Sequence, residues 1–369
     1  MIKIPEHVNK LITYKPGKPI QELRRDYGLE KIVKLGSNEN PLGPSPKAKE
    51  AINDSFKDLE FYPEPACIDI RKKFANKFGN QFNIKIENVI VGNGSEGIIN
   101  YIFKAFFQPG DELLTCQGSF IGVYVLAQAY NVPCHKLPLT KDYKFDLDNI
   151  IKNIDKKTKA IYLANPNNPT GTIFTKPDFE EFMSKVPSDI IVILDEAYYE
   201  FAVDLTDEYP IGINYDYDNL ISLRTFSKAY GIAGIRIGYG FAKSNIIEAL
   251  LKVKLPFEPS ISAQAAGMGA IDDDEFLKKT LDNNKKGLEY YYTELEKLSL
   301  KYFKSYANFV MIEFDTAEEV NQLNSELLKR GVIVRPLTAF GLPNCLRISI
   351  GTEEENKICM KNIRELLIK

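Results

Sequence analysis

Apolar residues recur in short runs, each followed by a turn and then by a longer segment with helical spacing. The runs at 160–164, 190–194 and 220–223 are mostly aliphatic, which is typical of strands buried on both faces of a parallel sheet. Two further strands are expected at 88–91 and 235–241. Strands that alternate with helices predict an α/β domain, with a mostly parallel sheet flanked by helices.

The pattern changes in the proline-containing segment 254–266. Beyond it we expect a long polar helix that begins at Glu275, and then strands at 309–314, 332–334 and 346–350 with a helix between the first two. This order indicates a smaller α+β domain. We therefore predict three parts, namely an N-terminal arm (1–45) that joins the small domain, a large domain (46–255) and a small C-terminal domain (256–369).

Composition excludes several function classes. The net charge of −3 gives no basic surface for nucleic acid, and no apolar run approaches the ~20 residues of a membrane span. The five cysteines are scattered without a C-x-x-C pair, and there are only two histidines. This usage favours a reducing compartment and argues against disulfides and a zinc site. Because the first ten residues also lack a signal-peptide core, we expect a cytoplasmic protein without a metal site.

The strongest candidate for chemistry is Lys228, which follows the apolar run at 220–223. A buried lysine is costly to keep charged, and burial lowers its pKa toward the neutral, nucleophilic form. Such an amine can bind covalently to an aldehyde cofactor. Thr225, Ser227 and Arg236 lie around it in the sequence and would donate hydrogen bonds to a phosphate.

Two other predicted strands end in complementary groups. Asp195 and Tyr198 follow the run at 190–194, and Asn168 follows the run at 160–164. The carboxyl ends of parallel strands are where open α/β sheets build their sites. Pyridoxal phosphate needs this set, because the aspartate keeps the pyridine nitrogen protonated while the asparagine and tyrosine bind the ring hydroxyl.

The chain resembles the class I and II pyridoxal-phosphate aminotransferases of fold type I. The resemblance rests on NPNNPTG, DEAYYEF and RTFSKAYGIAGIRIGY, and on YKPG, LGSNENPLG, YPEP, GNGSEGI and LRISIG, which follow in the family's order over essentially the whole chain. Within the family the chain is similar to the branch that transaminates histidinol phosphate. The resemblance implies pyridoxal 5'-phosphate as cofactor, with an amino donor and a 2-oxo acid as substrates. The implied pair is L-histidinol phosphate with 2-oxoglutarate, giving imidazole-acetol phosphate and L-glutamate in histidine biosynthesis.

The resemblance also implies roles for individual residues. Lys228 would be the catalytic lysine and general base, assisted by Asp195 and Tyr198. The remaining cofactor contacts would be Gly94, Ser95, Glu96, Phe120, Asn168, Thr225, Ser227, Arg236 and, from the other subunit of a homodimer with shared sites, Tyr62. The substrate contacts would be Tyr14, Asn38 or Glu39, Arg335 for a distal phosphate and Arg347 for the α-carboxylate.

Several alternatives remain open at this point. The segment Gly92–Gly97 has the G-x-G-x-x-G spacing of a dinucleotide site, but no acidic residue closes the second strand, which disfavours a nicotinamide dehydrogenase. An aromatic-amino-acid aminotransferase would share every cofactor residue, and Glu258 stands where many histidinol-phosphate enzymes have asparagine. A threonine-phosphate decarboxylase is a further alternative, because it also binds a phosphorylated amine. A cofactor-sensing transcription regulator would need an added DNA-binding domain, for which the residues before Tyr14 leave no room.

Overall fold

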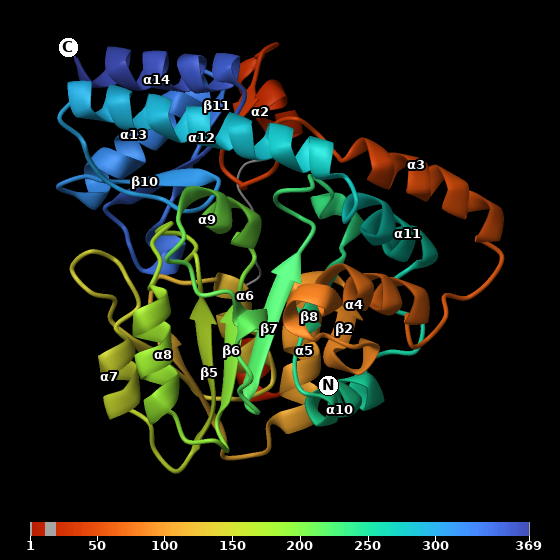
Figure 1. Ribbon diagram of the computed structural model, residues 1–369. Coiled ribbons are helices and arrows are strands. Elements are labelled where there is room, and N and C mark those ends of the chain that lie inside the picture. The colour runs from red at the N-terminus through yellow and green to blue at the C-terminus, as the bar shows by residue number, and fades with distance from the viewer. Residues whose placement is uncertain (1, 12–19, 369) are drawn as a thin grey trace.

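The computed structural model describes residues 2–11 and 20–368, which fold around two main sheets (Figure 1). The larger sheet has seven strands in the order β2-β8-β7-β6-β5-β3-β4. Strands β3 to β7 are parallel, whereas β8 is antiparallel to both neighbours. The strands are β2 (Val89–Gly92), β3 (Glu112–Cys116), β4 (Cys134–Leu137), β5 (Thr158–Ala164), β6 (Ile191–Asp195), β7 (Leu220–Thr225) and β8 (Gly238–Phe241).

Helices surround this sheet and bury its apolar strands. Every residue of β6 and β7 is buried. This agrees with the continuous apolar run at 190–194, whereas β7 also buries Ser222, Arg224 and Thr225. The helices of this part of the chain are α3 (Pro46–Ser55), α4 (Ile68–Phe82), α5 (Gly94–Phe106), α6 (Ile121–Ala129), α7 (Leu147–Lys152), α8 (Lys176–Lys185), α9 (Tyr199–Leu205), α10 (Ser244–Val253) and α11 (Ile261–Ala270), with short 3₁₀ helices η1 (Phe56–Asp58), η2 (Ile86–Asn88), η3 (Gly212–Asn214) and η4 (Ala233–Ile235).

The second body is an antiparallel sheet in the order β12-β13-β10-β9, covered by three helices that lie together at the top of Figure 1. Its elements are α12 (Asp274–Lys297), β9 (Lys301–Phe303), β10 (Phe309–Glu313), α13 (Ala317–Lys329), β11 (Val332–Ile333), β12 (Arg335–Pro336), η5 (Thr338–Phe340), β13 (Cys345–Ser349) and α14 (Glu353–Leu367). Near the N-terminus lie α1 (Glu6–Asn9), α2 (Ile20–Tyr27) and β1 (Val33–Lys34), which pairs with β11. The predicted α/β class is confirmed.

Two strand boundaries differ from the prediction. The strand expected at 235–241 begins only at Gly238, because η4 precedes it and Arg236 takes a left-handed backbone conformation (φ 61°). The strand expected at 332–334 ends at Ile333 as β11, and Val334 separates it from β12, which joins a different sheet. Pro336 lacks an N–H donor, and β12 is accordingly an edge strand.

The predicted division into residues 1–45, 46–255 and 256–369 remains a proposal. Helix α11 packs closely on α3, and a Cβ atom at Gly269 would lie 2.4 Å from the carbonyl oxygen of Lys47. The packing of the large body therefore continues beyond residue 255.

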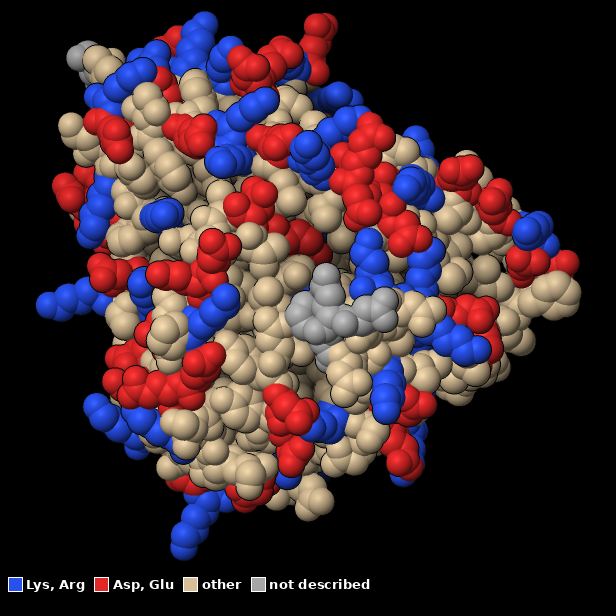
Figure 2. All heavy atoms as spheres, in the orientation of Figure 1, with Lys and Arg blue, Asp and Glu red and all other residues tan. Residues whose placement is uncertain are grey.

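In the part of the chain described here, no helix is both long and apolar enough to cross a membrane. On the face shown in Figure 2, acidic and basic side chains are interspersed.

Candidate active site

The carboxyl ends of β5, β6 and β7 meet at one edge of the large sheet. Ala164 of β5 lies opposite Asp195 of β6, and Asp195 lies opposite Leu223 of β7. Thr225 is two residues beyond Leu223 on the same face of β7. A cavity of about 200 Å³ opens there. The site residues that line it are Gly94, Ser95, Glu96, Phe120, Tyr162, Asn168, Asp195, Tyr198, Thr225, Ser227, Lys228 and Arg236.

One end of the cavity is built to receive an anion. Helix α5 begins at Gly94 with φ 76°, and its first N–H groups face the cavity end. A Cβ atom at Gly238 would lie 2.4 Å from the backbone nitrogen of Ser95, so only glycine lets β8 approach the helix start. The Thr225 and Ser227 hydroxyls are 3.0 Å apart on the same side. These donors suit a phosphate group.

The acidic residue at this end is balanced by Arg236. An oxygen of Glu96 lies 3.7 Å from the Arg236 guanidinium, and both side chains are half-exposed. The guanidinium also lies over the helix start, because a Cβ at Gly94 would be 3.0 Å from its Nη2 atom. Glu96 therefore lies at the start of α5, and its charge is paired with that of Arg236.

The other end of the cavity carries a buried carboxylate. Asp195 is only 4% exposed. Its Oδ2 atom accepts a hydrogen bond from the Tyr162 hydroxyl (2.7 Å), and its Oδ1 atom accepts one from the backbone N–H of Ala197 (3.1 Å). Burial raises the pKa of Asp195 to about 6, and these two hydrogen bonds oppose the rise. Asp195 is therefore mostly ionised at neutral pH.

Lys228 has the properties of a nucleophilic amine. Burial lowers its pKa to about 8, and the positive charge of Arg347 acts in the same direction. Its Nζ atom lies 5.7 Å from the centroid of the Tyr198 ring. A substantial fraction of the amine is therefore neutral near physiological pH, as nucleophilic attack on an aldehyde requires.

Tyr198 is held by the N-terminal segment. Its hydroxyl oxygen accepts a hydrogen bond from the Asn38 side-chain amide (2.8 Å). Asn38 is fixed in turn by Ser349 of β13, whose hydroxyl donates to Asn38 Oδ1 and accepts from the Asn38 backbone N–H. Burial raises the pKa of Tyr198 to about 12, so its hydroxyl stays protonated.

Glu39, the other residue expected near the substrate, pairs with Lys34 at 2.7 Å. Its negative charge favours the protonated form of Lys228 and so raises the pKa of that amine.

The two predicted arginines lie opposite each other on neighbouring strands. Arg347 of β13 is buried and donates to Asn168 Oδ1 and to the carbonyl of Gly36 (2.9 Å). Arg335 of β12 is its direct cross-strand partner and is partly buried. Like charges directly opposite are destabilising, so the pair favours an anion near this face.

The remaining predicted contacts lie at different places. Phe120 lines the cavity, and its ring covers Gly122 so closely that a Cβ there would be 2.4 Å from the ring. Tyr62 does not line the cavity of its own chain; it is 78% exposed and stacks on Phe257 at 4.3 Å between ring centroids. Tyr14 lies outside the described residues.

The sequence did not single out Tyr162 or Ser349. Tyr162 stands inside an apolar run, where a tyrosine is usually core packing. Its place two residues before Ala164 was the available signal, because it puts both on one face of β5. For Ser349 no local signal exists, since its partner Asn38 is 311 residues away.

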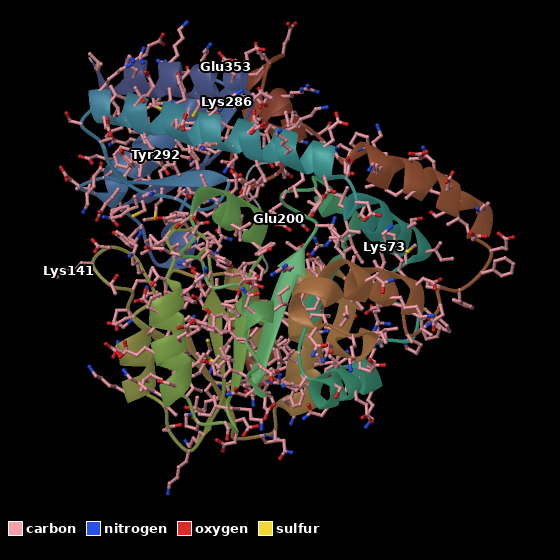
Figure 3. All side chains as sticks on the ribbon, in the orientation of Figure 1. Lys73, Lys141, Glu200, Lys286, Tyr292 and Glu353 are labelled. Atoms are coloured by element: carbon pink, nitrogen blue, oxygen red, sulfur yellow. The ribbon has the colours of Figure 1, made fainter. Side chains whose placement is uncertain are left out.

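A second set of buried charges lies behind the site. Arg224 of β7 and Glu196 are both inaccessible to solvent and pair at 3.1 Å, and the guanidinium stacks on the Tyr199 ring. Burial raises the pKa of nearby Glu200 to about 7. Glu200 lies on α9, which Figure 3 shows at the level where the two bodies meet. None of these three charged groups lines the cavity.

Comparisons with known proteins agree with this geometry. Residues 30–363 match the family model for aminotransferase class I and II. Histidinol-phosphate aminotransferase of Caldicellulosiruptor saccharolyticus is 41% identical over 98% of this chain and 99% of that protein. The enzyme of the same name from Bacillus subtilis is 38% identical over 99% and 100%. The crystal structure of histidinol-phosphate aminotransferase from Sinorhizobium meliloti in complex with pyridoxal-5'-phosphate superposes with a TM-score of 0.87 at 26% identity, covering 99% of each chain. The chain therefore belongs to the aminotransferase class I and II family.

Proposed function

We propose that this protein is a pyridoxal-phosphate-dependent histidinol-phosphate aminotransferase. The observation that carries the proposal is the composition of one cavity. It is lined by Lys228, whose pKa is lowered to about 8, by the buried carboxylate of Asp195 and by the first residues of α5. This donor set fits the cofactor: hydroxyls and α5 for the phosphate, Asp195 for the pyridine nitrogen, and Asn168 with Tyr198 for the ring hydroxyl. When bound, pyridoxal phosphate supplies an aldehyde for the amino group and an electron sink for the developing carbanion.

The residues of this chain would divide the work between them. Lys228 would hold the aldehyde group of the bound cofactor and, with its amine free, would act as general base for the proton at the substrate Cα. Asp195 would hold a proton on the ring nitrogen, because a carboxylate beside a cation favours the charged form of both. Phe120 packs over one side of the cavity and would fix the plane of the ring.

The substrate proposal rests on the relatives' names and on the two arginines. The α-carboxylate of glutamate on Arg347, or the phosphate of histidinol phosphate on Arg335, would place negative charge beside two opposed guanidinium groups. Glu258, which kept an aromatic-amino-acid aminotransferase open as an alternative, does not line the cavity, and its carboxylate accepts from the Tyr101 hydroxyl at 2.8 Å. It is therefore a weak argument for aromatic substrates.

A substrate panel tests this proposal. Purified enzyme with cofactor is assayed with L-histidinol phosphate, L-histidinol, L-phenylalanine and L-tyrosine as donors and 2-oxoglutarate as acceptor. We expect the highest kcat/KM for histidinol phosphate and a large loss when the phosphate is absent. A preference for phenylalanine or tyrosine would assign the protein to the aromatic alternative, and carbon dioxide release from L-threonine O-3-phosphate would indicate the decarboxylase.

We also propose a homodimer whose subunits share their active sites. The segments around η1 and around residue 257 expose large apolar side chains, and the Tyr62–Phe257 stack joins them. An exposed patch of this kind marks a protein–protein interface. The patch consists of Phe56, Leu59, Phe61, Tyr62, Leu255 and Phe257. A second copy seated here would bring its Tyr62 toward the phosphate end of the cavity.

Mixing two inactive variants tests the shared site. Lys228→Ala lacks the nucleophile but keeps Tyr62, whereas Tyr62→Ala lacks the tyrosine but keeps Lys228. After joint unfolding and refolding, mixed dimers would contain one site with both residues, so activity should rise above that of either variant alone. No recovery, or a monomer by light scattering, would contradict the shared site.

The unpaired state of all five cysteines supports our proposal of a cytoplasmic location.

A further inference from the structure

Tyr162 has no assigned role in the chemistry described so far. It lies on β5, is inaccessible to solvent and lines the same cavity as Asp195 and Lys228. Its hydroxyl donates a 2.7 Å hydrogen bond to Asp195 Oδ2. The Tyr162 hydroxyl is thus a side-chain hydrogen-bond donor to the Asp195 carboxylate.

The register of the sheet explains the contact. Tyr162 lies opposite Ile193 on β6, and Asp195 is two residues further along the same strand. Side chains two apart point to the same face, so the long phenol reaches diagonally from one strand to the next. Strand β5 is an interior strand held by β3 and β6. The position of the donor is therefore set by two hydrogen-bonded neighbours.

The buried phenol is a constant donor. Burial raises its pKa well above the usual value, and the negative charge of Asp195 adds to the rise. The hydroxyl thus stays protonated at every pH at which the enzyme would work. A donor on Oδ2 stabilises the ionised carboxylate, and this bond is the largest influence that opposes the effect of burial on the pKa of Asp195.

We propose that Tyr162 is a positioning residue for the cofactor's pyridine ring, orienting Asp195 and keeping it ionised so that it can hold the ring nitrogen proton. The inference rests on the proposed function, namely that the cavity binds pyridoxal phosphate. An ionised carboxylate accepts up to four hydrogen bonds. Tyr162 and Ala197 each use one site on different oxygens, and the face of Asp195 toward the cavity is left for the ring.

Tyr162→Phe removes the hydroxyl and keeps the ring. The variant is reconstituted with ¹⁵N-labelled pyridoxal phosphate, and the ¹⁵N chemical shift of the pyridine nitrogen is followed against pH. We expect the nitrogen to lose its proton at lower pH than in the wild type, because Asp195 stabilises the ring cation less well. The value of kcat should fall roughly 10-fold or more, as expected when a hydrogen bond to a charged group is removed, with a smaller change in KM.

Tyr209→Phe is the matched control. Tyr209 is equally buried, and its hydroxyl donates to the carbonyl of Asn165 and not to Asp195. Both variants lose one buried hydroxyl, so a general loosening of the fold would affect them alike. A change in the pyridine titration only in Tyr162→Phe supports the inference, and identical titrations in the two variants and the wild type overturn it.

The outcomes separate this inference from the proposed function. If the wild type does not bind pyridoxal phosphate, the proposed function fails. If it binds and Tyr162→Phe leaves the titration unchanged, only the role of Tyr162 fails. Should Tyr162→Phe not fold, a fluorinated tyrosine at position 162 preserves the packing. Its ¹⁹F resonance should then shift when Asp195 is changed to Asn, and an unchanged resonance would overturn the inference.

Discussion

Arg347→Gln removes a buried positive charge with two expected effects. The guanidinium is the proposed partner of the substrate α-carboxylate, so its loss should weaken every donor that carries one. The same charge lowers the pKa of Lys228, so its loss should let that pKa rise from about 8 toward the ordinary 10.5. The first effect concerns substrate recognition and the second concerns the nucleophile.

The magnitude of the first effect follows from the strength of a charge-assisted hydrogen bond. A hydrogen bond to a charged group contributes about 1.5–3 kcal/mol, which corresponds to roughly 10- to 150-fold in kcat/KM. The value for L-glutamate should fall by this factor. Histidinol phosphate has no carboxylate and should be affected less. Arg335→Gln should give the reverse order, because its proposed partner is the distal phosphate.

Single-turnover measurements of the two half-reactions provide the assay. The second effect is read from the rate at which apoenzyme attaches pyridoxal phosphate, trapped with borohydride at a series of pH values. Only the neutral amine reacts, so the midpoint of the rate profile should move to higher pH in Arg347→Gln. Arg347→Lys is the control, since it keeps the charge near Lys228 but loses the planar fork. Equal losses for glutamate and histidinol phosphate would refute substrate recognition and assign Arg347 to its hydrogen bonds with Asn168 and Gly36.

Four further predictions concern single groups. Borohydride reduction and peptide mapping should place the covalent adduct on Lys228, and Lys228→Ala should bind the cofactor reversibly without turnover; an adduct elsewhere would contradict this. Asp195→Asn keeps the shape and should lower kcat far more than cofactor affinity, so near-normal kcat would show that no carboxylate is needed. Glu96→Gln removes a negative charge beside the phosphate and should tighten cofactor binding up to about fivefold by titration, whereas weaker binding would mean that Glu96 positions Arg236. Glu196→Gln removes the carboxylate that pairs with Arg224 and should lower the free energy of unfolding in urea by about 3–5 kcal/mol; an unchanged midpoint would show that the Tyr199 ring and the nearby Glu200 satisfy the guanidinium.

The chemistry-bearing residues were predictable because each follows an apolar run. Asn168 and Lys228 follow β5 and β7, and Asp195 is the last residue of β6. The carboxyl ends of parallel strands necessarily share an edge. The cavity brings these three together as the sequence predicted. Gly94 was also predictable, because a glycine-rich turn between a strand and a helix suits a phosphate.

Contacts between distant segments were not predictable. Tyr162 has the sequence environment of a core residue, and only the register of β5 on β6 reveals that it reaches Asp195. Asn38 and Ser349 are joined by the packing of the N-terminal segment on the small sheet. Tyr62 lies outside the cavity of its own chain, so its proposed role would need a second subunit, whose position no single sequence specifies.

The ion pair behind the sheet explains how these strand ends are held in place. Arg224 directly precedes Thr225 on β7, so their side chains point to opposite faces. Glu196 directly follows Asp195 and pairs with Arg224, while the Ser222 hydroxyl donates to the same carboxylate. A buried ion pair adds little net stability but is costly to break, so it restrains β6 against β7 where both strands end. Arg224 and Glu196 thus fix, from the opposite face of the sheet, the spacing between the Asp195 carboxylate and the Thr225 hydroxyl.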